Sequence, residues 1–391
     1  MPVERAPLAG VRVLDLTAIV MGPLATQVLG DLGADVIKIE PPEGDVLRRA
    51  GAPPGSDLGP LFVHLNRNKR SVVLDLKGAE GKAALLRLAG EADVLVHSMR
   101  PQAMARLGLG YEALSAMNHR LIYAGLFGFG QRGPYAEQGA FDDLIQAVSG
   151  LADLVGRLSD GRPRYVPANI ADRSVGLYAF GLISAALYQR ERTGNGCELG
   201  VPMFETLASL LFGDHLYGET FRPAHGTMGY PRLMVRDRGP FPTSDGHICC
   251  MIYTDAQWRS FLTALGRDPD LAKDPMLSNM TSRTINSEAL FTMVSDITRT
   301  LPTAHWVATL RAVGLTVVAM RSLEELVDDS HLAATGFFHD ARTSNGESLR
   351  LFGPVGDWSN WEPAMRHSPP HLGEHTQDVL ANGWATRHPQ P

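Results

Sequence analysis

The chain has few cysteines and no excess of positive charge. Three cysteines among 391 residues, Cys197, Cys249 and Cys250, are too few for a disulfide framework, and the adjacent pair lacks metal-site spacing. The formal net charge of −6 gives no overall attraction to nucleic acid or to an anionic membrane. We therefore expect a protein of a reducing compartment, the cytoplasm, with neither nucleic acid nor membrane as partner.

Several other patterns are missing. No apolar run reaches membrane-spanning length, and the N-terminus MPVERAPLAG has no signal pattern. No G-x-S-x-G elbow indicates a serine hydrolase. The H-x-x-E-H string from His371 to His375 contains Gly373 and follows two prolines, so a helix presenting both imidazoles is not expected. We predict no metal site.

What is present indicates an α/β protein. The composition, 44% hydrophobic and 20% charged, is that of a soluble globular protein, and the length predicts two domains. Helical patterns separate short apolar segments, and this alternation predicts a mostly parallel, helix-covered sheet. Strands are expected at 11–16, 35–40, 71–76, 92–97 and 121–127, and helices at 24–32, 78–89 and 111–117.

One glycine motif suggests a nucleotide site but is not followed by the helix that such a site needs. The segment 128–133, GFGQRG, matches G-x-G-x-x-G after a predicted strand. Pro134 and a polar stretch follow where a helix should open, so a nicotinamide cofactor is disfavoured. A basic group at 67–70 is a better candidate for holding a polyphosphate, and Lys38, Arg100 and Arg106 occupy comparable positions between elements.

The most apolar segment, 175–187, predicts a helix buried all round, and 199–212 predicts a second apolar helix. A helix with a glycine break is expected over 141–155. Asp172 begins the central helix and is open to two interpretations. It is either an N-cap or a carboxylate nucleophile held at the end of a rigid element.

Several strings together resemble family III CoA-transferases, which include formyl-CoA:oxalate CoA-transferase and α-methylacyl-CoA racemase. The strings span nearly the whole chain: PLAGVRVLDLTAIVMGPLATQVLGDLGADVIKIEPPEGD, LNRNKRSVVLDLK, RPQAMARLGLGYEALSAMNHRLIY, GFGQRGPYAEQGAFDDLIQAVSGL, the Asp172 stretch with its RTGNG tail, and PPHLGEHT.

The resemblance implies a fold and an assembly. It implies a large Rossmann-like domain, with a mostly parallel sheet, built from both chain ends (1–225 and 325–391). A smaller inserted α+β domain is expected over 226–324. Two such chains would interlock into a homodimer.

The resemblance also implies the site. Asp172 would be the catalytic aspartate, and Asp142 would lie near it and orient or repel the substrate carboxylates. Coenzyme A and acyl-CoA would be substrates, with no tightly bound cofactor. The implied CoA-contacting positions are Ile19, Val20, Met21, Lys38, Asn68, Lys69, Ser98, Met99 and Arg106.

Two departures from the patterns of this family bear on the expected reaction. Where the racemase branch has a histidine before its aspartate, this chain has Phe141 before Asp142, which favours transfer over α-proton exchange. The glycine-only loop of formyl-CoA:oxalate CoA-transferase has no counterpart around 230–245. An acyl-CoA racemase or epimerase and a non-catalytic CoA-binding protein are the alternatives.

The expected reaction moves CoA from a donor acyl-CoA to an acceptor mono- or dicarboxylic acid, in acyl-CoA metabolism. Asp172 would form an anhydride and then an aspartyl-CoA thioester. The helix dipole predicts that this carboxylate is ionised at neutral pH.

Overall fold

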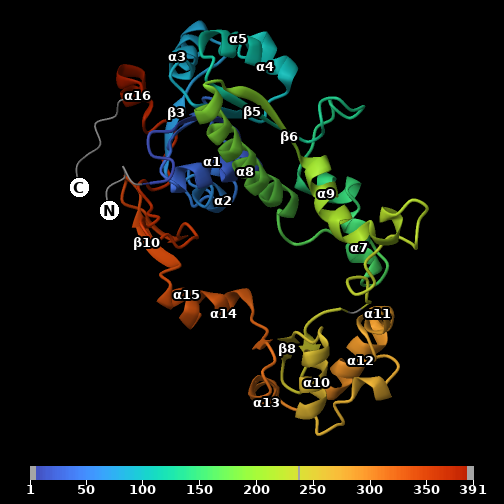
Figure 1. Ribbon diagram of the computed structural model, residues 1–391. Coiled ribbons are helices and arrows are strands. Elements are labelled where there is room, and N and C mark those ends of the chain that lie inside the picture. Colours follow the sequence, from blue (N-terminus) through green and yellow to red (C-terminus); the bar gives the residue numbers. More distant parts are fainter. Residues whose placement is uncertain (1–5, 237, 385–391) are drawn as a thin grey trace. The chain divides into compact units, whose positions relative to one another are not determined.

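The computed structural model describes residues 6–236 and 238–384 and divides into two compact units (Figure 1). The first unit contains the described residues up to Ser149, then Val166–Ser209, and the described residues from His331 onward. The second contains Gly150–Tyr165 and the described part of Leu210–Ser330. The domain boundaries expected near 225 and 325 stay a prediction.

A six-stranded parallel sheet forms the centre of the first unit, in the order β3-β2-β1-β4-β5-β6. This confirms the parallel α/β architecture, and the order is that of doubly wound nucleotide-binding folds. The chain runs outward in opposite directions from β1 and β4, so the sheet has a switch point between these strands. The strands are β1 (Arg12–Leu16), β2 (Asp35–Glu40), β3 (Lys69–Val73), β4 (Val94–His97), β5 (Ile122–Phe127) and β6 (Cys197–Pro202).

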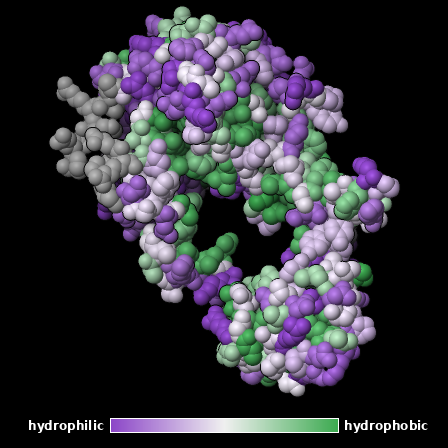
Figure 2. All heavy atoms as spheres, viewed as in Figure 1, coloured by the Kyte–Doolittle hydropathy of each residue, from purple (hydrophilic) through white to green (hydrophobic). Residues whose placement is uncertain are grey.

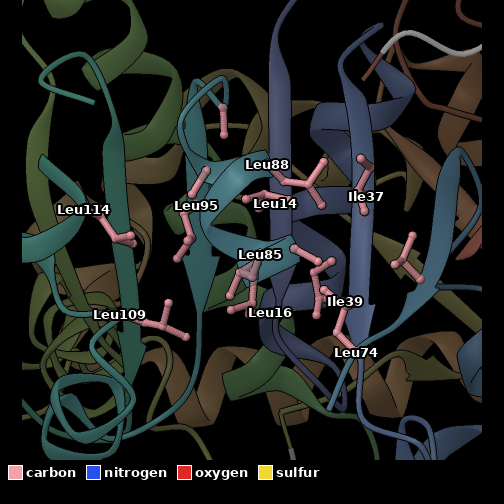
Figure 3. Packing of buried hydrophobic residues seen from close by; sticks show 14 of the residues in the cluster. Leu14, Leu16, Ile37, Ile39, Leu74, Leu85, Leu88, Leu95, Leu109 and Leu114 are labelled. Atoms are coloured by element: carbon pink, nitrogen blue, oxygen red, sulfur yellow. The ribbon is translucent and has the colours of Figure 1, made fainter. Parts of the chain in front are cut away.

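One face of this sheet carries the main hydrophobic core. Alternate residues of neighbouring strands, such as Leu14 and Leu16, Ile37 and Ile39, and Leu95, pack against Leu85 and Leu88 of α3 (Figure 3). The C-terminal helix adds Val379 to the same core. The helices over this face are α3 (Ala79–Ala89), α4 (Pro101–Leu107), α5 (Tyr111–Met117) and α16 (Thr376–Asn382).

Helices α1 (Met21–Asp31) and α8 (Ile170–Thr193) pack directly against each other. A Cβ built at Gly176 of α8 would lie 2.6 Å from the carbonyl oxygen of Met21, so only glycine allows this approach. The prediction that α8 is buried all round is wrong. Its buried face includes Val175, Ala179 and Ile183, while Leu177 and Tyr178 are each 53% exposed.

Strand β6 corrects a second expectation. The segment 199–212 was predicted as one helix, but Cys197–Pro202 pairs in parallel with β5, and α9 (Met203–His215) begins only after it. Pro202 removes a backbone donor at the start of α9, where helices tolerate its absence. The apolar run therefore contains an edge strand and a helix.

Among the described residues, α8 is the one helix long and apolar enough to cross a membrane. Core helices of soluble proteins meet the same criteria of length and composition.

The second unit has its own core around Trp258, Phe261 and Trp306. A three-stranded antiparallel sheet, β7-β8-β9, packs with the helices in this core, and β7 and β8 form a hairpin across the Ser-Asp-Gly turn at 244–246. Its elements are α7 (Leu151–Arg157), β7 (Phe241–Pro242), β8 (His247–Cys250), α10 (Asp255–Ala264), α11 (Met280–Ile285), α12 (Ser287–Thr298), α13 (Thr303–Ala312), β9 (Val317–Ala319) and α14 (Leu323–Val327).

The remaining elements are α2 (Pro60–Val63), α6 (Asp142–Val148), α15 (Ser330–Ala334), β10 (Phe338–Arg342) and β11 (Ser348–Phe352). The last two strands form an antiparallel hairpin in the first unit. The predicted helix over 141–155 is two helices, α6 and α7, separated at Gly150, whose positive φ of 89° breaks the run.

Candidate active site

Asp172 lies in the first turn of α8, not at its N-cap. Asn169 is the N-cap, and Asp172 is the third helical residue, so the N-cap interpretation is wrong in position. The backbone N–H of Asp172 is one of the donors that a helix start leaves unpaired. It donates to Oδ1 of Asp142, at 2.9 Å. A carboxylate from another helix thus caps α8, and the Asp172 side chain is not used for that purpose.

Asp142 is itself held by a buried glutamine that the sequence analysis missed. Nε2 of Gln146 donates to Oδ2 of Asp142 at 2.6 Å, and Oε1 of Gln146 accepts from the backbone N–H of Val166 at 2.9 Å. Asp142 and Gln146 are four residues apart on α6, a spacing that places side chains on one helix face. Gln146 therefore ties the carboxylate of Asp142 to the segment that leads into α8, and this spacing was the signal that could have identified it.

The electrostatics of Asp172 differ from the expectation. Burial, and then the negative charge of Asp142, raise the pKa of Asp172 from 3.8 to about 7, against a smaller opposite effect of Arg173. The helix dipole was expected to keep this carboxylate ionised at neutral pH, but desolvation outweighs it. The carboxyl group of Asp172 therefore titrates near neutral pH.

The turn after β1 brings Ile19, Val20 and Met21 to the carboxyl edge of the sheet. Ile19 has a φ of 71°, a left-handed conformation that is rare and strained for a β-branched residue. Its N–H donates to the carboxylate of Asp45, with the nearer oxygen at 3.2 Å. Val20 is the N-cap of α1, and Met21 is its first residue. Backbone groups at a helix start near a switch point are suited to bind a ligand.

Lys38 and Lys69, expected to contact CoA, are fully buried and paired. Nζ of Lys38 lies 3.1 Å from Asp45 and 2.9 Å from the carbonyl oxygen of Thr17. Burial disfavours its charge, but the acids around it, first Asp15, raise its pKa. Lys38 thereby fixes the turn after β1 at Thr17, and Asp45 fixes the same turn at Ile19.

Lys69 uses all three of its donors inside the protein. Nζ lies 2.9 Å from each of Oδ2 of Asp15, the carbonyl oxygen of Pro23 and Oδ1 of Asn66. Burial dominates and lowers the pKa of Lys69 to about 8, despite the charge of Asp15. Burial also opposes ionisation of Asp15, but Lys69 and Lys38 outweigh it and hold its pKa well below the usual range. The Lys69 ammonium has no donor left for a ligand in this structure.

Asn68 is also engaged within the protein. Its φ is 60°, its Nδ2 donates to Asp31 at 2.7 Å, and its Oδ1 accepts the backbone N–H of Arg366 at 2.6 Å. The side chain therefore joins the start of β3 to the C-terminal segment.

Ser98, Met99 and Arg106 follow β4 and are accessible to different degrees. Ser98 and Arg106 are exposed, and Met99 is half-buried. Leu16 and His97 are partners in the parallel register of β1 and β4, so Ser98 follows β4 at the level where the Thr17 turn follows β1. Of the three cations predicted at the CoA site, only Arg106 is exposed.

The structure brings the turn of residues 19–21 and Asp172 into one region of the first unit. Gly176 contacts the start of α1, and Asp172 precedes Gly176 by four residues on the same buried face of α8. Four residues of α-helix span about 6 Å. Asp172 thus lies about one helical turn from the point where α8 contacts the start of α1, which follows the carboxyl end of β1.

The two sequence motifs that suggested other chemistry have structural roles. The N–H of Gly130, in GFGQRG, donates to the carboxylate of Glu205, and no helix opens on Gly133. In H-x-x-E-H, His371 pairs with Asp57, and Glu374 accepts the N–H of His371. Within residues 6–236 and 238–384, no group of three or more His, Cys, Asp or Glu side chains is placed to hold a metal ion.

Comparison with known proteins gives consistent matches over most of the chain. The family model described as CoA-transferase family III matches residues 8–376. Succinate–glutarate CoA-transferase of Agrobacterium fabrum is 31% identical, over 97% of this chain and 96% of its own length. Formyl-CoA:oxalate CoA-transferase of Streptomyces avermitilis is 32% identical, over 95% of this chain and 94% of its own length.

Solved structures agree with these matches. A crystal structure of Rv3272 from Mycobacterium tuberculosis has a TM-score of 0.81 at 31% identity, covering 95% of this chain and 98% of its own. A crystal structure of a CAIB/BAIF family protein from Brucella suis has a TM-score of 0.79 at 31% identity, and the match covers 96% of this chain and 99% of the other.

Proposed function

The chain belongs to CoA-transferase family III, and from this membership and the geometry around Asp172 we propose an acyl-CoA:carboxylate CoA-transferase with Asp172 as its nucleophile. The observation that carries the proposal is a desolvated carboxylate that caps nothing, at the edge of the sheet where α/β folds bind ligands. A structural carboxylate at a helix start would be expected to bond to the helix itself.

The proposed reaction proceeds through covalent intermediates on this one carboxylate. The ionised Asp172 attacks the thioester carbonyl of the donor, the C–S bond breaks, and a mixed anhydride and CoA thiolate form. The thiolate attacks the aspartyl carbonyl, which gives an aspartyl-CoA thioester and releases the donor acid. The acceptor carboxylate then attacks the aspartyl carbonyl of this thioester, which forms a second mixed anhydride and releases CoA thiolate. The thiolate attacks the acceptor's acyl carbon, which gives the product acyl-CoA and frees the Asp172 carboxylate. Each step exchanges one acyl bond for another, which is the benefit of covalent catalysis.

The environment of Asp172 suits this role. Desolvation raises its basicity, and a carboxylate stripped of water is a stronger nucleophile than a hydrated one. Asp142 adds a negative charge and accepts the backbone N–H at 2.9 Å, which fixes the start of α8. We assign Asp142 and Gln146 as positioning residues that hold this geometry and keep the pKa of Asp172 high.

Trapping of the activated acyl bond tests the nucleophile. The native protein is incubated with a panel of acyl-CoA donors and then with hydroxylamine or borohydride, and the peptides are mapped by mass spectrometry. We expect a hydroxamate or an alcohol on Asp172 only. Asp143, an exposed neighbour of Asp142, is the matched position that should stay unlabelled. Label on Asp142 or Asp143, or transfer activity retained by Asp172→Asn, would overturn the assignment.

For CoA, the structure favours exposed groups over the buried lysines. We propose that the 19–21 turn, Ser98 and Met99 contact the ligand and that Arg106 meets its phosphates. Arg106→Ala should weaken CoA-ester binding more at low salt than at high salt, because ions screen an exposed contact. Arg192→Ala, near the far end of α8, is the control. Equal affinity of the Arg106→Ala variant and the native protein at low salt would place the nucleotide elsewhere.

Finally, we propose an interlocked homodimer. Apolar side chains are exposed on α8 and α6 of the first unit and at the N-cap of α6, among them Tyr188, Val148 and Phe141. Figure 2 shows hydrophobic surface along the region that α8 occupies in Figure 1. An exposed apolar surface of this kind indicates a protein interface. Interlocked chains should dissociate only on unfolding, so a folded monomer at nanomolar concentration in sedimentation experiments would refute the proposal.

A further inference from the structure

A cavity of about 380 Å³ lies within the second unit, apart from the residues assigned above. Its walls come from β7, β8, α10, α11 and α12. The lining is mainly apolar and aromatic, with Phe241, Tyr253, Trp258, Phe291 and Val294 among its residues. At about 30 Å³ for each water in the liquid, the volume equals that of about a dozen waters, and it falls within the usual range for small-molecule sites.

Three arginines also line this cavity, and no Asp or Glu is among its described lining residues. The guanidinium of Arg232 lies over the rings of Tyr253 and Phe291, with centroid distances of 4.9 and 5.7 Å. Its single hydrogen bond within the described chain goes to the sulfur of Met251. Arg238 is near enough to repel it, and burial followed by this repulsion lowers the pKa of Arg232.

Arg283 gives an independent sign of an unfilled polar contact. The residue is 5% exposed, and its guanidinium bonds to the carbonyl oxygen of Leu277 and to Asp255. Its Nε is buried and has no hydrogen-bond partner among the described residues. Buried donors are nearly always paired, so the wall of the cavity contains a donor for which the described residues supply no acceptor.

We propose that this cavity is a binding site for an amphipathic monocarboxylate, with an aryl or branched alkyl body among the aromatic side chains and its carboxylate at the arginines. An anion would relieve the repulsion between Arg232 and Arg238 and give their donors an acceptor. The apolar walls would favour the hydrocarbon body and reject a small dicarboxylate, because its second charge would be buried without a partner. The proposal does not depend on Asp172.

Calorimetric titration of the full chain without CoA tests the proposal, with 3-phenylpropanoate as the probe. 3-Phenylpropan-1-ol has the same body without charge, and succinate has charge without the body. We expect the phenylpropanoate to bind at least tenfold more tightly than either. Arg232→Gln should weaken the acid about tenfold and leave the alcohol unchanged, and Arg238→Gln should act in the same direction. Arg299→Gln removes an exposed arginine that does not line the cavity, and it should change nothing.

A second measurement locates the ligand. Cys249 is exposed and lines the cavity, so bound phenylpropanoate should slow its alkylation by iodoacetamide, while Cys197 serves as the internal reference. Asp172→Asn should bind the probe normally, which separates this proposal from the assignment of the nucleophile. Equal binding of acid and alcohol, unchanged affinity in both arginine variants, or no protection of Cys249 would overturn it.

Discussion

Replacing Asp172 with asparagine should stabilise the protein at alkaline pH while abolishing transfer. The pKa of Asp172 is raised to about 7 in the folded state by burial and by Asp142, whereas an unfolded aspartate titrates near 3.9. The folded state therefore binds this proton more tightly than the unfolded state does. It follows that the stability associated with the protonated form is present below about pH 4 and is lost as the pH rises to about 7.

The magnitude follows from the two pKa values. Above pH 7 the buried charge costs at most about 4 kcal/mol, and at pH 5 it costs about 1–2 kcal/mol. Asparagine does not titrate, and it leaves the backbone N–H of Asp172 bonded to Asp142. The advantage in folding stability of the Asn variant over the native protein should therefore grow by about 2–3 kcal/mol between pH 5 and pH 8.

Urea unfolding of both proteins at pH 5 and pH 8, at one protein concentration, measures this difference. Effects of pH on groups that do not interact with residue 172 cancel, because the two proteins are compared at each pH. Asp143→Asn, which removes an exposed carboxylate from the same helix, should show no such growth. If the Asn variant is no more stable to urea than the native protein, or is more stable by the same amount at both pH values, then Asp172 carries no buried charge and the argument from desolvation fails.

Three further substitutions test the surroundings of the site. Asp142→Asn removes the neighbouring negative charge, so the acid limb of the kcat/KM profile should move to lower pH; an unmoved limb would show that burial alone raises the pKa of Asp172. Lys69→Ala leaves Asp15 buried without its partner and should cost about 3–5 kcal/mol in urea unfolding; an equally stable variant with weaker CoA binding would reverse its structural assignment. Gly176→Ala inserts a methyl group where α1 and α8 touch and should cost about 1–3 kcal/mol by the same measurement; unchanged stability would mean that the two helices separate easily.

The fold could largely be predicted because most strands are short apolar runs bounded by glycine, proline or charge. Strand β2, for example, was placed at 35–40, and the structure has it at Asp35–Glu40. Strand β6 was missed for a physical reason. It lies at the edge of the sheet with only Val201 fully buried, and its apolar residues continue directly into α9. A short apolar run next to a helix does not reveal by periodicity which of the two it is.

The site was less predictable, because its properties depend on partners distant in sequence. The sequence predicts Lys69 as a contact for the CoA phosphates, and its ion partner in the structure, Asp15, lies 54 residues earlier. Local sequence cannot show that a cation is already neutralised. The pKa of Asp172 was misjudged in the same way, since the helix dipole is visible in the sequence but burial and the position of Asp142 are not.

The buried charges under the site have a consequence for catalysis. Ile19 adopts a strained conformation at the point where the chain turns towards α1, and a strained turn persists only if its surroundings determine it. Lys38 binds the carbonyl oxygen before this turn, and Asp45 accepts the N–H of Ile19 within it. Buried ion pairs contribute little net stability, but each partner is costly to lose, so such a pair fixes geometry better than it adds free energy. At the proposed CoA site, these buried cations would shape the backbone that faces the substrate, and attraction for its phosphates would fall to exposed groups such as Arg106. Binding and chemistry would then respond differently to salt, because screening weakens the exposed contact and leaves the buried pairs, and the position of Asp172, unchanged.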